Sequence, residues 1–198
     1  MEKPALSDHT IHPLLTRRWS PRAFHSRKVE KAKLQRIFEA ARWAPSANNE
    51  QPWHFIIGEA GDDTFLKIFE TLAEFNRLWV KTAPVVMLMV GKVKSNRTGK
   101  NNLWWQYDAG QSVAHLTFQA AYEGLWLHQM GGFDMKKAEK LFNIPEGYAA
   151  VSVIAVGYQG DYKELHPNLQ KLELTGRERK NTSTFVFSNI FGERSNLI

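Results

Sequence analysis

The chain has 198 residues, of which 43% are hydrophobic and 12% aromatic, and it carries a net charge of +6. This composition excludes a disordered protein, and a chain of this length buries roughly 70% of its unfolded surface, so we expect residues 1–198 to form a single domain. The absence of cysteine excludes disulfides, thiolate nucleophiles and cysteine metal sites. Any redox chemistry must therefore come from a bound cofactor.

The positive charge favours anionic ligands, because it raises their local concentration. Phosphorylated cofactors and nucleic acid both meet this description. The sequence has no recognition helix with clustered base-reading residues and no zinc-finger or RNA-binding signature, so a non-enzymatic nucleic-acid-binding protein is the remote alternative. It also lacks the Rossmann and P-loop fingerprints, and its histidines show no metal-ligand spacing. We expect neither a nucleic-acid partner nor a metal site.

The N-terminal residues 1–8 lack the apolar core of a signal peptide. The longest strongly apolar run, residues 84–90, is too short to span a bilayer. These observations predict a cytoplasmic protein without a membrane segment.

The first candidate site along the chain is a basic segment that contains Arg17, Arg18, Ser20 and Arg22. Guanidinium groups suit a phosphate because they offer paired donors that keep their charge, and serine adds a neutral hydroxyl donor. The segment alone is weak support for a site, since basic clusters are usually solvated surface.

A helix is predicted from Val29 to Ala44, because its apolar residues fall on one stripe and Pro45 disfavours its continuation. The loop that follows is rich in amides, among them Asn49 and Gln51. Amide side chains donate and accept hydrogen bonds, which suits the alternating N–H and C=O edge of a flavin ring. Taken together, the basic segment and this amide loop indicate a bound phosphorylated flavin.

The next stretch predicts two strands around a helix. Trp53 to Gly58 is expected to be a short buried strand, and Thr64 to Lys81 carries apolar residues at helical spacing. Val85 to Gly91 is apolar without alternation, which is typical of a central strand.

Residues 92–102 are polar, basic and contain glycine, which predicts a mobile loop. An aromatic cluster with Trp104, Trp105 and Tyr107 follows directly. Such a cluster suits a substrate lid and a hydrophobic dimer contact equally well, and the sequence leaves both open.

The remaining chain predicts helices at 108–123 and 135–142 and strands at 126–130 and 149–158. After a polar stretch, Thr184 to Phe187 regains β character without an obvious neighbour in the sequence. Because helices and strands alternate irregularly, the pattern indicates a layered α+β fold.

Several motifs in this order resemble the nitroreductase family of FMN-dependent oxidoreductases. The matching motifs are Arg17 to Phe24, Val29 to Ala44, Ala44 to Trp53, Asn76 to Pro84, Gly131 to Asp134, Ile144 to Tyr148 and Val156 to Tyr158. The resemblance implies a central, mainly antiparallel sheet flanked by helices. It also implies FMN held non-covalently at a homodimer interface, with shared active sites and the C-terminal segment reaching the partner subunit.

By this resemblance, Arg18 and Ser20 hold the phosphate and ribityl side of FMN, joined by Arg179 or Lys180. The basic run at 177–180 departs from the family's pattern, in which a proline commonly follows, so the exact phosphate ligand stays open. Arg22 is the cation expected to tune the ring, because negative charge gathers on the N1 and C2 carbonyl region of reduced flavin. No other catalytic side chain is required.

Glycine at 131 and 132 lets the backbone approach flavin N5, and the amide loop is expected to reach the flavin from the partner chain. The full set of expected flavin contacts is Arg18, Trp19, Ser20, Arg22, Pro45, Ser46, Asn49, Gln51, Asn76, Met130, Gly131, Gly132, Arg179 and Lys180.

The expected activity is ping-pong transfer from NADH or NADPH to nitroaromatics, quinones or related small acceptors. The same resemblance also allows a reductive dehalogenase, a dehydrogenase or a flavin-fragmenting enzyme.

Overall fold

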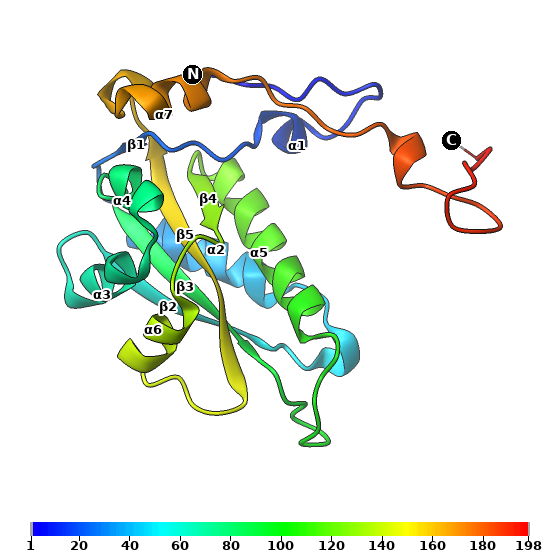
Figure 1. Cartoon of the computed structure of the whole chain (residues 1–198), viewed down its shortest axis with the longest axis horizontal. Helices are drawn as coiled ribbons and strands as arrows, with labels where there is room; N and C mark the ends of the chain where they lie inside the picture. Colours follow the sequence, from blue (N-terminus) through cyan, green and yellow to red (C-terminus); the bar gives the residue numbers. More distant parts are fainter. Residues whose placement is uncertain (1, 198) are drawn as a thin grey trace.

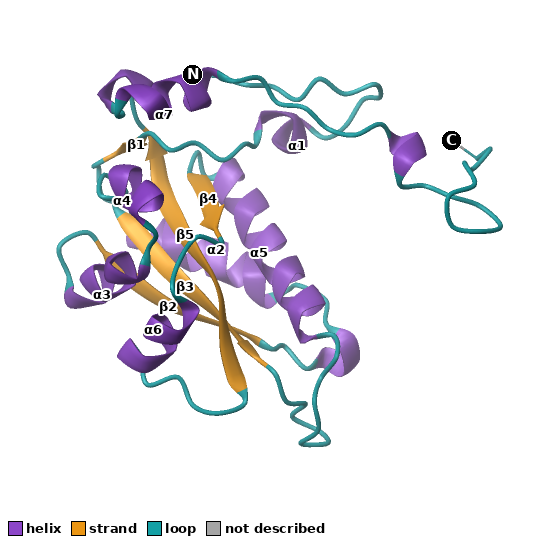
Figure 2. Ribbon diagram, viewed as in Figure 1, coloured by secondary structure: helices purple, strands orange, loops and turns teal. Residues whose placement is uncertain are grey.

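One five-stranded sheet forms the centre of the molecule in the computed structural model, which describes residues 2–197 (Figures 1 and 2). Its strands are β1 (Phe24–His25), β2 (Trp53–Glu59), β3 (Val85–Lys92), β4 (Trp126–Met130) and β5 (Tyr148–Gln159). The order is β1-β5-β3-β2, and β4 pairs with β5. Every pair of strands is antiparallel. The predicted α+β class with an antiparallel sheet is confirmed.

Strand β3 lies at the centre of the sheet and is buried on both faces. Because successive side chains of a strand point to opposite faces, Val86 and Leu88 belong to one core, whereas Met87 and Met89 belong to the other. This arrangement confirms the central strand expected at Val85 to Gly91.

Helices cover both faces of this sheet, as Figure 2 shows. Helices α3 (Asp63–Thr71), α4 (Glu74–Val80) and α6 (Met135–Leu141) pack on one face, and α2 (Lys31–Arg42) and α5 (Trp105–Tyr122) on the other. Asp134 caps α6 as expected, because its carboxylate accepts a hydrogen bond from Lys137 N at 2.9 Å. No helix within residues 2–197 is both long and apolar enough to cross a membrane.

The prediction of a single helix from Thr64 to Lys81 is wrong, because the helix is interrupted between α3 and α4. Leu72 adopts an extended backbone and pairs with Phe133. The neighbouring Ala73 N–H donates to Gly132 O at 3.0 Å. Tertiary pairing therefore overrides the helical spacing at this point and brings α4 beside the glycine turn.

Residues 92–102 form a closed hairpin rather than an open loop. Ser95 N donates to Lys100 O at 2.8 Å, and Asn102 N donates to Val93 O at the same distance. The hairpin is also fastened to the amide loop, since the buried Glu50 carboxylate accepts hydrogen bonds from Ser95 Oγ and, at 2.6 Å, from Asn96 N.

Two helices were not foreseen, α1 (Pro13–Arg17) and α7 (Pro167–Leu174). The β segment expected at Thr184 to Phe187 is wrong. A short 3₁₀ turn, η3 (Thr182–Thr184), stands there, and Phe187 forms only an isolated bridge to Arg194. Two further 3₁₀ turns, η1 (Ala47–Asn49) and η2 (Tyr162–Glu164), lie elsewhere in the chain.

Residues 181–197, which we call the C-terminal arm, run away from the body beyond α7 (Figure 1). Their hydrogen bonds join residues within the arm itself. Several large apolar side chains of the arm are exposed, including Phe185, Ile190 and Phe191. The arm thus carries apolar surface that the rest of its own chain does not cover.

Candidate functional site

A cavity of about 320 Å³ opens between the basic segment and the end of α7. Arg18, Trp19, Ser20 and Arg22 line it on one side, and Arg179 on the other, so the structure unites these predicted residues. Two further cations, Lys3 and Arg177, also line it. The cavity is therefore lined by five cationic residues, one acidic residue, Glu178, and Ser20.

The cations of this cavity repel one another. Burial, together with the neighbouring Arg177 and Arg179, lowers the pKa of the half-buried Arg18. Burial also lowers the pKa of Lys3 more than Glu173 raises it. Because each positive charge raises the cost of the next, an anion bound here would relieve a repulsion already present in the empty cavity. A phosphate matches both the charge and the donors.

Arg22, which lines the same cavity, carries an unsatisfied donor. Its Nε is buried, and no hydrogen-bond partner for it exists among the described residues. The Nε1 atom of Trp19 is orphaned in the same way. Buried donors without partners are uncommon in folded proteins, and they are expected where a ligand completes the site.

A chain of contacts leads from Arg22 to the glycine turn. The Arg22 guanidinium lies over the ring of Phe75, 5.8 Å from its centroid. The next residue, Asn76, donates from Nδ2 to Gly132 O at 2.9 Å. A Cβ on Gly132 would lie 2.8 Å from that nitrogen, whereas one on Gly131 would meet no atom within 4 Å. The cationic cavity, Phe75, Asn76 and the glycine turn at residues 131–132 therefore follow one another along the surface of the protein. We call this row of residues the strip.

The predicted contacts Met130 and Lys180 are placed differently. Met130 is buried in the core, directly before the glycine turn at residues 131–132. Lys180 is exposed and is not among the residues that line the cavity. Of the two alternatives for the late phosphate ligand, the geometry favours Arg179, together with the unforeseen Arg177.

The amide loop lies at the other end of α5. Ala47 N donates to the buried Asp108 carboxylate at 3.1 Å, near the start of that helix. Near its end, Arg17 donates to Ala121 O. Because an α-helix rises about 1.5 Å per residue, Asp108 and Ala121 lie about 20 Å apart. The structure therefore does not bring Pro45, Ser46, Asn49 and Gln51 to the cationic cavity of their own chain.

The amide loop has an unusual backbone. Asn48, Asn49 and Gln51 all have left-handed φ angles, 51°, 55° and 47°. The turn is held by Gln51 N, which donates to Ser46 Oγ at 3.1 Å, and by the Asp108 contact. Such strain is typical of functional loops that the surrounding structure fixes.

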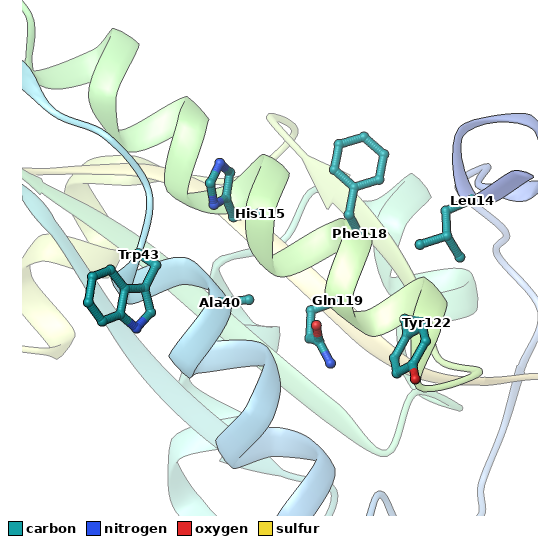
Figure 3. Close-up of a pocket in the computed structure, with 7 residues that line it drawn as sticks. All are labelled: Leu14, Ala40, Trp43, His115, Phe118, Gln119 and Tyr122. Atoms are coloured by element: carbon teal, nitrogen blue, oxygen red, sulfur yellow. The ribbon is translucent and has the colours of Figure 1, made fainter. Parts of the chain in front are cut away.

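An apolar groove of about 460 Å³ opens elsewhere on the surface (Figure 3). It runs between α1, α2 and α5, and Figure 3 shows Trp43, directly after α2, and Tyr122, at the end of α5, among its walls. Both aromatic side chains are more than two thirds exposed, at 68% and 72%. Trp105, by contrast, packs over Gly91, where a Cβ would lie 2.3 Å from its ring, while Trp104 is exposed.

Comparison with known proteins places the chain among flavin enzymes. The model of the nitroreductase family matches residues 15–75 and 58–158. A solved structure described as an oxidoreductase containing FMN superimposes with a TM-score of 0.89 at 30% identity, covering 95% of this chain and 96% of that one.

Two curated relatives have different names. A protein of Archaeoglobus fulgidus, provisionally named as an NADH dehydrogenase/NAD(P)H nitroreductase, is 28% identical over 163 residues, which are 80% of this chain and 90% of the relative. The iodotyrosine deiodinase of Thermotoga neapolitana is 26% identical over 79% of this chain and 92% of its own length. On the strength of the family match and the shared fold, the chain belongs to the nitroreductase family of oxidoreductases.

Proposed function

We propose that this protein is an FMN-dependent NAD(P)H oxidoreductase that reduces nitroaromatics, quinones or related small acceptors. The observation that carries the proposal is the cavity in which five cations surround Ser20 and lead, by way of Arg22 and Asn76, to the glycine turn. The FMN named in the superimposed oxidoreductase supports the same reading.

The residues of the strip suit the parts of FMN. Arg18, Ser20, Arg177 and Arg179 would hold the phosphate, which two or more guanidiniums can bind in paired fashion. When bound, FMN would supply transfer of a hydride from NADH or NADPH and of electrons to the acceptor. Arg22 would place a fixed positive charge where the reduced ring gathers negative charge. Gly132 keeps the backbone accessible, because a side chain there would displace Asn76.

We also propose that two chains build each site. The amide loop and the cationic cavity lie at opposite ends of α5, so an antiparallel α5–α5 contact in a C2 dimer brings the loop of one chain to the cavity of the other. The outer face of α5 supports this contact, because Trp104, Tyr107, His115 and Tyr122 are exposed along it at helical spacing. The uncovered apolar arm supports it as well.

The first test is the visible spectrum of the purified protein, before and after anaerobic addition of NADH or NADPH. Bound flavin should absorb in the visible range and bleach on reduction. A colourless protein that binds no added FMN would overturn the proposal and return the basic nucleic-acid-binding alternative.

The shared site is tested by mixed dimers of Arg18→Ala and Asn49→Gly chains. Glycine is used at position 49 because it removes the amide while tolerating the left-handed backbone there. Each homodimer should be nearly inactive, whereas one of the two sites in the mixed dimer is intact, and about half of the wild-type activity should return. Mixed dimers as inactive as their parents would show that the loop serves its own chain.

We propose a ping-pong mechanism, because the described chain offers one flavin strip and the sequence has no separate dinucleotide fingerprint. Initial rates at varied NAD(P)H and acceptor should give parallel double-reciprocal lines. Intersecting lines would contradict the mechanism.

The deiodinase relative favours one second candidate, reductive dehalogenation on the same flavin. The two candidates differ in their product. With equal amounts of a nitrophenol and an iodophenol, the nitroreductase should consume the first and release no iodide, and iodide release at a comparable rate would favour the second.

A further inference from the structure

Glu173 is one of the few carboxylates buried in the described chain, and it lies in α7 next to Leu172, which lines the cationic cavity. Its side chain is fully shielded from solvent. The nearest cationic atom recorded for its carboxylate is Arg22 Nη1, 3.9 Å from Oε2, which is too far for a hydrogen bond, while Lys3 Nζ donates to the main-chain O of Glu173 at 2.6 Å. A charge buried without a close ion pair is costly, so its surroundings must stabilise it in another way.

The backbone of the basic segment provides that stabilisation. Glu173 Oε1 accepts hydrogen bonds from Arg22 N at 2.8 Å and from Ala23 N at 3.1 Å, and Oε2 lies 3.1 Å from Arg22 N. Such charge-assisted bonds to backbone N–H groups are stronger than neutral ones. One carboxylate, 150 residues further along the chain, therefore fixes two consecutive peptide groups.

These peptide groups decide where Arg22 points. The segment between α1 and β1 has no regular secondary structure up to Ala23, and Pro21 has no N–H to donate. Besides Glu173, the backbone of this turn is held by His128, whose Nδ1 lies 2.9 Å from Pro21 O, and by Gly160 N, which donates to Ala23 O at 2.8 Å. Without Glu173, both N–H groups at the root of the Arg22 side chain would be left unpaired.

We infer that Glu173 is the positioning residue of the flavin site: it holds the Arg22 main chain so that the guanidinium is directed toward the flavin ring. This inference rests on the proposed function, and it assigns to the unforeseen helix α7 a role in the site. Glu173 acts through Arg22 and does not itself contact the cofactor.

The test compares Glu173→Ala, Glu173→Gln and Arg22→Ala in the full-length protein, with the exposed Glu164→Ala as matched control. Glu173→Ala should raise the Kd for FMN roughly tenfold, as expected when about one charge-assisted bond is lost. It should also make the flavin midpoint potential more negative, in the same direction as Arg22→Ala. Glu173→Gln should retain most of the affinity, because one amide oxygen in the place of Oε1 can accept from both N–H groups.

The decisive variant is the double mutant Glu173→Ala/Arg22→Ala. If Glu173 acts through Arg22, the double mutant should have the potential of Arg22→Ala alone. Additive shifts in potential, or unchanged potential and affinity in Glu173→Ala, would overturn the inference while wild-type FMN binding upholds the proposed function. If Glu173→Ala fails to fold, Glu173→Asp takes its place, because its side chain is one methylene shorter and reaches the two N–H groups less well. Faster amide exchange at Arg22 and Ala23 in Glu173→Asp supports the inference, and unchanged exchange overturns it.

A wild-type protein that binds no FMN would overturn the proposed function itself. The two failures are therefore distinguishable.

Discussion

Arg18 shows at the scale of single residues how the cavity is prepared for an anion. Burial and two neighbouring guanidiniums lower its pKa, yet arginine keeps its charge at any physiological pH. The repulsion among the cations is therefore independent of pH in this range, and a phosphate bound in the cavity, as proposed above, would release it.

Replacement of Arg18 by alanine should therefore weaken FMN binding by about 1.5 to 3 kcal/mol, the range for a hydrogen bond to a charged group. Titration of the apoprotein with FMN, followed by fluorescence quenching, measures the change. Lys180→Ala is the matched control, because this lysine is exposed outside the cavity. Equal losses in both variants would mean that general positive charge, and not the cavity, binds the cofactor.

His128 supports the same segment and adds a pH dependence. Its burial lowers the pKa to about 4 from the ordinary value of 6.5. The neutral ring therefore donates from Nδ1 to Pro21 O, and the ring also lies against Trp79, with the centroids 4.5 Å apart.

Between these two pKa values the unfolded chain binds more protons than the folded one at this residue. The contribution of His128 to stability should thus be lost as the pH falls from about 6.5 to about 4, on the order of 3 kcal/mol in total. Urea unfolding of the apoprotein across this range provides the measurement. His128→Gln should flatten the curve, and an equally steep loss in that variant would assign the effect to other groups.

At the scale of elements, the amide loop and the hairpin of residues 92–102 act as one unit because Glu50 joins them. Glu50→Gln removes the negative charge and leaves a single acceptor oxygen in place of the two that bind Ser95 Oγ and Asn96 N. Amide hydrogen exchange in the hairpin should become roughly tenfold faster, as for a loss of one hydrogen bond. The exposed Glu164→Gln provides the control, and unchanged exchange in Glu50→Gln would show that the hairpin is held without the amide loop.

Elements that depend on local patterns were predictable from the sequence. Strand β4 was predicted with the observed bounds, and α2 and β5 within two residues at each end. The interruption between α3 and α4 could not be predicted, because it depends on the bridge between Leu72 and Phe133, which are far apart in the sequence. The β segment expected after Thr184 failed for the same reason, since β character alone does not provide a partner strand.

The residues of the candidate site were likewise predictable only where they lie close together in the sequence. Arg18, Ser20 and Arg22 stand together in the sequence, and together with the amide loop they indicated a phosphorylated flavin. Lys3 and Glu173 come to the cavity from distant segments, and no spacing in the sequence connects them to it. Helix α7, which carries Glu173, does have local signs in the sequence, namely Pro167 at its start and Leu165, Leu169 and Leu172 at helical spacing.

At the scale of the whole molecule, the C-terminal arm exposes apolar side chains that its own chain leaves uncovered. Deletion of residues 181–198 should weaken self-association of the protein while the body, whose core does not include the arm, remains folded. Sedimentation velocity at micromolar concentration compares the two proteins, and circular dichroism checks the fold. An unchanged dimer without the arm would assign association to the α5 face alone.

The separation of the amide loop and the cationic cavity along α5 also has a thermodynamic consequence. If FMN touches both chains, each bound flavin stabilises the dimer, and each dimer raises the affinity for flavin, because linkage between two binding equilibria is reciprocal. The cofactor would then stabilise the contact between the subunits in addition to its role in electron transfer. Dilution of the enzyme should release flavin, and a cell short of riboflavin would accumulate separated monomers in place of an intact but empty dimer.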